Sequence, residues 1–180
     1  KEQLIVNTPE SFEKLTGVRV ITNTEAVKVR REEKLVEAVH TGTGETVTYP
    51  YDKLVIATGA SPIRPSMEGI DLEGIYFMRT PQDAISLRER LEKKDVKRAV
   101  VVGGGFIGLE VAENLASQGI RVSVIDLADH VLPGFDPEMA EYVENYLADQ
   151  GIMTFTGTKL EGFVGEGKLE KVKTSRKAMK

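Results

Sequence analysis

Residues 100–108 run Val-Val-Val-Gly-Gly-Gly-Phe-Ile-Gly, an apolar stretch followed by the spacing G-x-G-x-x-G at Gly103, Gly105 and Gly108. Residues 98–102, which are apolar after Arg98, are typical of a strand buried on both faces, and residues 106–118 are typical of a helix. A glycine loop that joins a buried strand to a helix favours a dinucleotide-binding turn. The spacing alone is a weak signal, and its place between a buried strand and a helix makes it a strong one.

Each glycine of the loop has a separate physical role. Gly103 permits the tight turn from strand to helix, Gly105 lets the backbone approach a pyrophosphate, and Gly108 lets the helix pack close to the strand. The anion then meets free N–H groups and the positive end of the helix dipole. Asp126 stands 18 residues after Gly108, at the end of the next predicted strand, where a carboxylate accepts hydrogen bonds from the adenosine ribose. A glycine-rich turn beside a surface aspartate is the plain structural alternative.

Strands and helices alternate through the second half of the chain. Further strands are predicted at 121–126 and 152–156, with a helix at 137–150 between them. This alternation predicts an α/β fold with a Rossmann-like, doubly wound parallel sheet. Two more stretches, 160–164 and 169–174, are joined by a Gly-Glu-Gly turn and predict a hairpin attached to that sheet.

The first half of the chain is rich in predicted strands. A short helix begins after Thr8, and strands are expected at 18–22, 26–30, 35–40, 46–49 and 53–57. The run Leu-Val-Ile-Ala at 54–57 is continuously apolar, which is typical of a strand buried on both faces. Residues 61–65 form a proline-rich connector, 75–78 a possible strand, and Thr80 with Asp83 a capping box that opens a helix through about residue 91.

Composition excludes several classes of function. The chain has 41% hydrophobic and 29% charged residues and no apolar run near the roughly 20 residues that span a bilayer, so neither a transmembrane helix nor a signal peptide is expected. A net charge of -4 argues against nucleic acid as a partner. Without cysteine, and with His40 and His130 as its only histidines, the chain is expected to hold no disulfide or metal site and to be cytoplasmic.

Charge also bears on the choice of dinucleotide. From Val122 to Thr158 there is no Lys or Arg, which leaves a 2′-phosphate beside Asp126 without a guanidinium partner and favours NAD over NADP. His130 is the nearby candidate to offset this, although a solvated loop histidine is the plainer interpretation. The acidic residues of this segment are Asp126, Asp129, Asp136, Glu138, Glu141, Glu144 and Asp149.

Two stretches resemble the FAD-dependent pyridine nucleotide-disulfide oxidoreductases. Residues 51–60, Tyr-Asp-Lys-Leu-Val-Ile-Ala-Thr-Gly-Ala, are similar to the family's strand and ATG segment, and residues 100–113 to its NAD-binding loop and helix. Within the family, residues 8–12, 23–25 and 75–79 resemble the branch of NADH oxidases, NADH peroxidases and coenzyme A disulfide reductases. A branch without a redox cysteine, such as the ferredoxin or rubredoxin reductases, stays open.

The resemblance implies two cofactors, NAD(H) and FAD, and a role for each matching residue. Phe106 resembles the aromatic residue that lies over the flavin until nicotinamide displaces it, and Glu110 an acidic residue near the nicotinamide. Phe135 stands where the family often has an aromatic residue near the adenine, and Arg79 matches an arginine that reaches FAD. The expected NAD side is Gly103, Gly105, Phe106, Ile107, Gly108, Glu110, Asp126 and Phe135, and the expected FAD side is Ala57, Thr58, Gly59, Ala60 and Arg79.

The resemblance also implies a segment of a longer flavoprotein. Residues 1–61 match part of an FAD-binding domain, and residues 62–180 match an NAD-binding domain that lacks its last strand. The family's redox cysteine and its dimerisation domain would lie outside these residues, so the full-length protein is expected to be a homodimer. The implied reaction passes hydride from NADH to FAD, with a peroxide, dioxygen or a disulfide as final acceptor. The alternative is a non-catalytic regulatory module that senses NAD.

Overall fold

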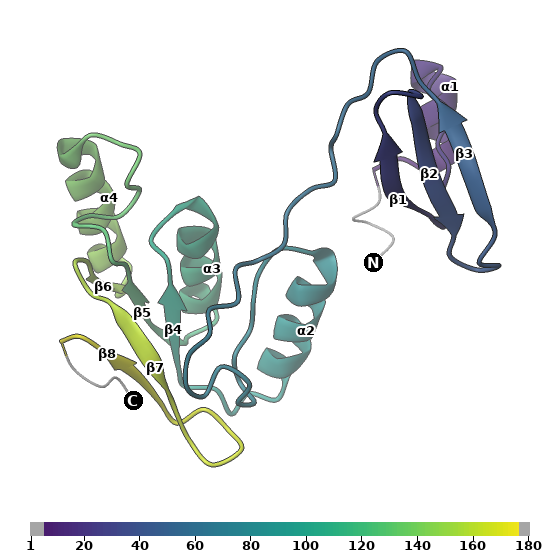
Figure 1. The fold of residues 1–180 in the computed structure, drawn as a ribbon. Coiled ribbons are helices and arrows are strands. Elements are labelled where there is room, and N and C mark those ends of the chain that lie inside the picture. The colour runs from purple at the N-terminus through teal and green to yellow at the C-terminus, as the bar shows by residue number, and fades with distance from the viewer. Residues whose placement is uncertain (1–5, 177–180) are drawn as a thin grey trace. The chain divides into compact units, whose positions relative to one another are not determined.

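The computed structural model describes residues 6–176, and its contacts divide the chain into two units between Ala60 and Ser61. Figure 1 labels the elements of both units. The amino-terminal unit contains one helix and an antiparallel sheet, whereas the carboxy-terminal unit contains a parallel sheet, three helices and a hairpin.

The amino-terminal unit begins with helix α1, Pro9–Thr16. The Thr8 side chain accepts from the backbone of Ser11, and Gly17 ends the helix in the left-handed conformation at φ 74°. Three strands follow, β1 (Thr24–Arg30), β2 (Leu35–His40) and β3 (Thr46–Pro50), which pair antiparallel in that order. The cap of α1 and the hairpin turn at residues 41–44 are confirmed.

The expected buried strand at 53–57 is wrong. Residues 54–57 pair with no strand among the described residues, and Val55 and Ile56 are 85% and 75% exposed. The apolar run predicted a strand covered on both faces, but such a strand needs neighbours on both sides. The described part of this unit contains only one buried hydrophobic side chain, Ala38, so no second layer covers the run.

Two further expected strands are also absent. Residues 18–22 and 75–78 have no strand geometry. Both are apolar stretches without a pairing partner in the described structure, and a strand is defined by its pairing rather than by its composition.

The carboxy-terminal unit is built on three parallel strands, β4 (Arg98–Val102), β5 (Arg121–Ile125) and β6 (Met153–Phe155), adjacent in that order. Helix α3, Phe106–Ser117, connects β4 to β5, and helix α4, Pro137–Asp149, connects β5 to β6. Helix α2, Pro81–Glu92, precedes the sheet and begins with the predicted capping box of Thr80 and Asp83. The α/β fold with a parallel sheet is confirmed.

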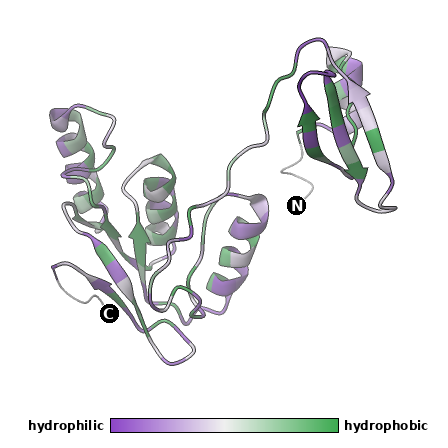
Figure 2. Ribbon diagram, in the orientation of Figure 1, coloured by the Kyte–Doolittle hydropathy of each residue, from purple (hydrophilic) through white to green (hydrophobic). Residues whose placement is uncertain are grey.

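The three helices pack against one face of the parallel sheet. Side chains of Val122 and Val124 on β5 meet Leu109 and Ala112 on α3 and Leu147 on α4 in one core cluster. Full burial of a valine or leucine side chain stabilises the fold by about 1.5–3 kcal/mol. In Figure 2 the strands of this sheet are hydrophobic, whereas α4 carries hydrophilic turns.

The other face of the sheet is covered by a hairpin of β7 (Leu160–Val164) and β8 (Lys171–Thr174). Phe163 and Val172 of the hairpin pack with Ile125 of β5, and apolar residues of the 67–75 segment join this second cluster. The hairpin itself is confirmed. It forms a separate two-stranded sheet, so it packs on the parallel sheet instead of extending its hydrogen-bonded ladder.

Within the described residues, no helix has both the length and the apolar composition that crossing a membrane requires.

Candidate functional site

The glycine loop follows β4 and opens α3, as the sequence predicts. Gly103 has φ 109°, a conformation that favours glycine, and its N–H donates to the Ile125 carbonyl at 2.9 Å. Gly105 is the N-cap of α3 and provides no side-chain cap. A Cβ added to Gly105 would find nothing within 4 Å, so the space in front of this helix end is open.

Gly108 marks a close approach of helix and loop. A Cβ at this position would lie 1.9 Å from the Gly103 carbonyl oxygen and 3.4 Å from Cγ1 of Val101. No side chain fits there without a shift of the loop. The three glycines therefore stand where a turn, an open approach and a close packing contact need them.

The middle glycine, Gly104, also has a structural role, which the sequence reasoning missed. Gly104 is buried, its N–H donates to Oδ2 of Asp126 at 2.6 Å, and its carbonyl accepts from Leu132 N–H at 2.8 Å. An added Cβ would lie 3.2 Å from Val131 Cγ1. The run of three consecutive glycines was the available signal, because G-x-G-x-x-G does not require a glycine at position 104.

Asp126 links the end of β5 to the glycine loop. Its Oδ2 accepts from Gly104 N–H, and its Oδ1 accepts from Ala128 N–H at 2.8 Å. The side chain is half-buried, so these two bonds fix its orientation. A carboxylate oxygen accepts more than one hydrogen bond, and both oxygens keep capacity for a ligand hydroxyl.

A cleft of ≈ 320 Å³ lies at the carboxyl end of β4 and β5. In open α/β sheets this edge is where ligands bind. The cleft is lined by Val102, Gly103, Ile125, Asp126, Leu127, Thr158, Lys159 and Leu160. It therefore brings one predicted glycine together with the predicted ribose-binding aspartate.

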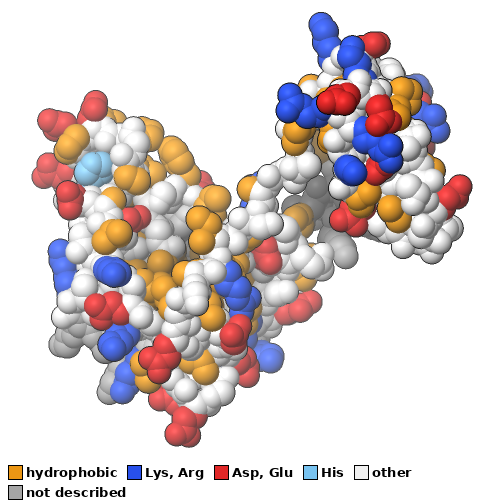
Figure 3. Space-filling view, in the orientation of Figure 1, with side chains coloured by type: hydrophobic (Ala, Val, Ile, Leu, Met, Phe, Trp, Pro, Cys, Tyr) orange, Lys and Arg blue, Asp and Glu red, His pale blue; other side chains and the backbone are white. Residues whose placement is uncertain are grey.

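Two cations near this cleft lie outside the cation-free segment that the sequence singled out. Lys159 lines the cleft itself, and Nη2 of Arg176 lies 3.4 Å from where a Cβ of Gly157 would stand, in the neighbourhood of Asp129. Both residues follow Thr158 in the chain, so they were not part of the segment from Val122 to Thr158 that the sequence analysis considered. Figure 3 shows acidic side chains gathered over α4 of the same unit.

The structure brings Phe106 and Phe135 together. Their ring centroids are 5.7 Å apart with an interplanar angle of 71°, and the two rings are 66% and 44% exposed. Ile107 is 58% exposed, and Glu110 is exposed on the next turn of α3. Phe106 was assigned to the nicotinamide end and Phe135 to the adenine end, so this edge-to-face pair is a contact that the sequence did not predict.

The expected flavin-side residues belong to different units. Ala57, Thr58, Gly59 and Ala60 end the amino-terminal unit as exposed backbone without regular secondary structure, with Gly59 at φ 76°. Arg79 belongs to the carboxy-terminal unit, where its backbone N–H donates to Oδ2 of Asp83 at 3.1 Å. Their role at FAD stays a prediction.

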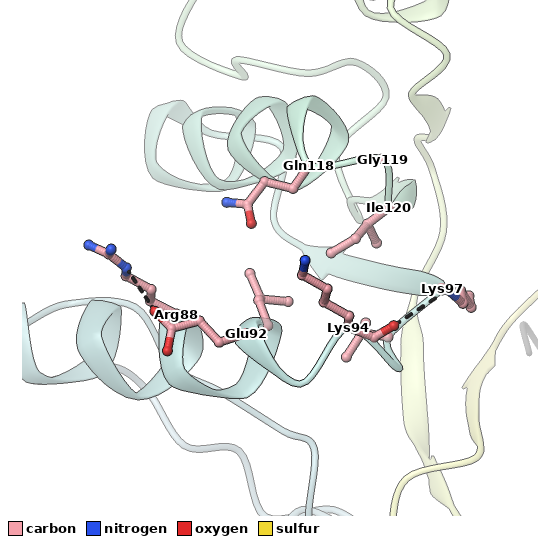
Figure 4. A pocket seen from close by; sticks show the side chains of 9 residues that line it. Arg88, Glu92, Lys94, Lys97, Gln118, Gly119 and Ile120 are labelled. Carbon is pink, nitrogen blue, oxygen red and sulfur yellow. Dashed lines mark hydrogen bonds and ion pairs between the residues drawn. The ribbon is translucent and has the colours of Figure 1, made fainter.

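A larger hollow of ≈ 660 Å³ lies at the opposite edge of the parallel sheet (Figure 4). Lys94 and Lys97 lie on the connection from α2 to β4, and Gln118 and Gly119 follow α3. The carboxyl ends of two helices face this hollow, and their dipoles disfavour a phosphate there. It is therefore a poorer place for a dinucleotide than the cleft beside Asp126.

Comparisons with known proteins match nearly the whole chain. A family model described as pyridine nucleotide-disulphide oxidoreductase matches residues 2–179. An NADH oxidase of Methanocaldococcus jannaschii is 37% identical over 172 residues, which is 95% of this chain and 38% of that protein. A CoA-dependent NAD(P)H sulfur oxidoreductase of Pyrococcus abyssi is 37% identical over 96% of this chain and 38% of its own length. The chain thus spans about 38% of these curated relatives.

Solved structures show the same fold. A water-forming NADH oxidase from Lactobacillus brevis bound to NADH has a TM-score of 0.84 and 29% identity, covering 99% of this chain and 39% of that one. An engineered NADPH oxidase made from it by five substitutions and bound to NADPH has a TM-score of 0.83 and 27% identity, with the same coverage.

Proposed function

The chain belongs to the pyridine nucleotide-disulphide oxidoreductase family, and on this premise we propose that it binds NAD(H) at the glycine loop as part of a flavoprotein that passes hydride from NADH to FAD. The observation that carries the proposal is the open space at Gly105 in front of α3, together with Asp126 in the adjoining cleft. Residues 1–61 are proposed as part of the FAD-binding domain and residues 62–180 as the NAD-binding domain.

The residues present fit a dinucleotide. A Cβ at Gly105 would enter the space that a pyrophosphate needs, and the absence of a side-chain cap leaves the end of α3 to an anion. Asp126 would accept from the ribose hydroxyls while it holds Gly104. Ala57 to Ala60 and Arg79 would contact FAD. When bound, the two cofactors supply the hydride chemistry, and this chain's part is to bind and orient them.

We propose that NADH is preferred over NADPH. A phosphate on the ribose would meet the carboxylate of Asp126 at close range. The engineered NADPH oxidase supports this proposal. Three of its substitutions replace a glycine, an aspartate 18 positions after that glycine, and a proline seven positions after the aspartate. The same residue types stand at the same spacings in this chain, as Gly108, Asp126 and Pro133.

Titration of this chain with each nucleotide tests the proposal. NADH is expected to bind more tightly than NADPH, and Asp126→Ala is expected to weaken NADH about 10- to 100-fold, since hydrogen bonds to a charged group are lost. Combining Asp126→Ala with Leu127→Arg, Ala128→Ser and Pro133→Arg is expected to reverse the preference. Equal affinities in the parent, or no effect of Asp126→Ala, would contradict the assignment.

The final electron acceptor is proposed to be a peroxide, dioxygen or a disulfide, in line with relatives named NADH oxidase and sulfur oxidoreductase. The 180 residues contain no cysteine, so a thiol step would need a residue outside them. Anaerobic stopped-flow spectroscopy of the full-length flavoprotein that contains this chain would separate the two half-reactions: NADH should reduce the flavin, and the true acceptor should reoxidise it within one turnover time.

A further inference from the structure

The loop between β5 and α4, residues 127–136, is tied to the glycine loop by a strained residue. Leu132 has φ 49°, in the left-handed region that residues with a side chain rarely adopt. It is 8% exposed, its N–H donates to the Gly104 carbonyl at 2.8 Å, and its own carbonyl accepts from Phe135 N–H at 2.8 Å. Backbone strain of this kind persists only where the surroundings hold it in place.

Glu144 is the group that holds the preceding residue. Val131 is 1% exposed, and its N–H donates to Oε1 of Glu144 at 3.0 Å. Its carbonyl lies 2.8 Å from Nδ1 of His130. Side chains thus satisfy both main-chain groups of this buried residue. An unpartnered buried N–H is costly, so without an acceptor at Glu144 the loop would have to move.

Glu144 is itself held by a rigid element. It lies on α4 between Ala140 and Leu147, which are 0% and 1% exposed and pack in the core against the parallel sheet. Its carboxylate therefore reaches the 127–136 loop from a fixed helix. The chain of contacts runs from α4 through Val131 and Leu132 to Gly104, whose N–H is bound by Asp126.

We propose that Glu144 is a positioning residue for dinucleotide binding: without touching the nucleotide, it fixes the 127–136 loop against the glycine loop and so keeps Gly104 and Asp126 in place. The inference rests on the proposed function for its consequence at the nucleotide. Its structural half, that Glu144 orders Val131 and Leu132, stands independently of any ligand.

Amide hydrogen exchange without nucleotide tests the structural half. In the parent chain the Val131 and Leu132 amides are expected to exchange slowly. Glu144→Met keeps the length of the side chain but has no acceptor oxygen, and it should speed both amides by about tenfold or more. Glu141→Met, on the exposed face of the same helix, is the control and should leave them unchanged. Fast exchange of Val131 in the parent, or equal rates in the two variants, would overturn the proposal.

Nucleotide titration tests the functional half. Glu144→Met is expected to weaken NADH about tenfold, and Glu144→Gln, whose amide oxygen still accepts from Val131, should restore affinity to within about twofold of the parent. Glu141→Met should bind as the parent does. Unchanged affinity in Glu144→Met, or a loss of similar size in Glu144→Gln, overturns the positioning role. Failure of the parent to bind NADH contradicts the proposed function instead, and the exchange rates then decide the inference about Glu144.

Discussion

Gly105 and Gly108 lack a side chain for different physical reasons. One substitution to alanine at each position separates the effect on nucleotide binding from the effect on stability. A Cβ at Gly105 meets no atom within 4 Å, and its φ of -81° suits any residue. Gly105→Ala should therefore change the free energy of unfolding by less than about 0.5 kcal/mol. It should nevertheless weaken NADH about 10- to 100-fold, because the methyl group occupies the approach to the helix end.

In Gly108→Ala, by contrast, the main effect should be on the free energy of unfolding. Its Cβ would collide with the Gly103 carbonyl, so the loop must shift at a cost of about 1–3 kcal/mol, offset in part by about 1 kcal/mol of helix propensity. Urea unfolding and NADH titration of both variants check the pair. If Gly105→Ala unfolds more easily than Gly108→Ala, the close approach has been assigned to the wrong glycine.

Substitution of Lys159 tests which residues set the preference between NADH and NADPH. It is a cation lining the cleft that contains Asp126. Lys159→Gln should therefore weaken NADPH more than NADH, because only NADPH carries a 2′-phosphate for the ammonium to attract. Titrations at low and moderate salt measure the ratio of the two dissociation constants, with Lys173→Gln on β8 as the control. A ratio that does not change would place the Lys159 charge away from the ribose.

At the scale of single residues, the sequence predicted positions that are set by short, fixed spacings. It missed contacts between residues that only the tertiary structure brings together. Gly103, Gly105, Gly108 and Asp126 follow from fixed spacings within one strand-helix-strand unit. The contact from Glu144 to Val131 spans 13 residues and depends on how α4 packs, and no spacing rule predicts it. Lys159 stands directly after the cation-free segment, and its place in the cleft likewise depends on tertiary structure, because the chain must return past Asp126 as it enters β7.

Among the elements, α2 is stabilised at its start by a group that titrates. The backbone N–H of Thr80 donates to the Asp83 carboxylate, the Thr80 hydroxyl and the Arg79 N–H add further bonds, and together they lower the pKa of Asp83 below its ordinary 3.8. A depressed folded-state pKa contributes stability that is present above the unfolded value and is lost as the pH falls through the folded value.

The stability difference between the parent and Asp83→Asn should accordingly depend on pH. It should be constant above about pH 5, where an aspartate is ionised in both states, and it should shrink below pH 3.8 as the parent's carboxylate takes up a proton. Urea unfolding from pH 2.5 to 7 gives the difference, and NMR titration of the carboxyl carbon gives the midpoint directly. A midpoint at or above 3.8 would contradict the capping geometry.

The elements also show where apolar patterns mislead. Residues 99–102 and 54–57 are both short apolar runs, yet the first belongs to a paired strand and the second is exposed backbone without regular secondary structure. The difference lies in their neighbours. The first run has β5 beside it and packs between α3 and the β7–β8 hairpin, whereas the described amino-terminal unit has no strand or helix to cover the second. Composition indicates what a segment can bury, and the rest of the fold decides whether it does.

Across the whole molecule, buried side chains are distributed unevenly between the two units. Of the buried hydrophobic residues in the described structure, Ala38 alone lies in the amino-terminal unit, and both core clusters lie in the carboxy-terminal one. Stability should follow this distribution, because hydrophobic burial is the main favourable contribution to folding. Amides of β4 and β5 should exchange far more slowly than those of β1 and β3.

The same distribution predicts that residues 61–180 fold and bind nucleotide without residues 1–60. Every residue of the proposed NAD site lies in the carboxy-terminal unit, so the shortened chain should bind NADH with a dissociation constant within about twofold of the parent's, equivalent to about 0.4 kcal/mol. Calorimetric titration and circular dichroism of both chains measure this. A folded shortened chain that binds NADH tenfold more weakly would show that the amino-terminal unit supplies part of the site.

Flavin should be retained by neither chain, because Ala57 to Ala60, on the expected FAD side, are exposed backbone in the parent and absent from the shortened chain. Absorbance near 450 nm in purified protein is therefore expected to be at background.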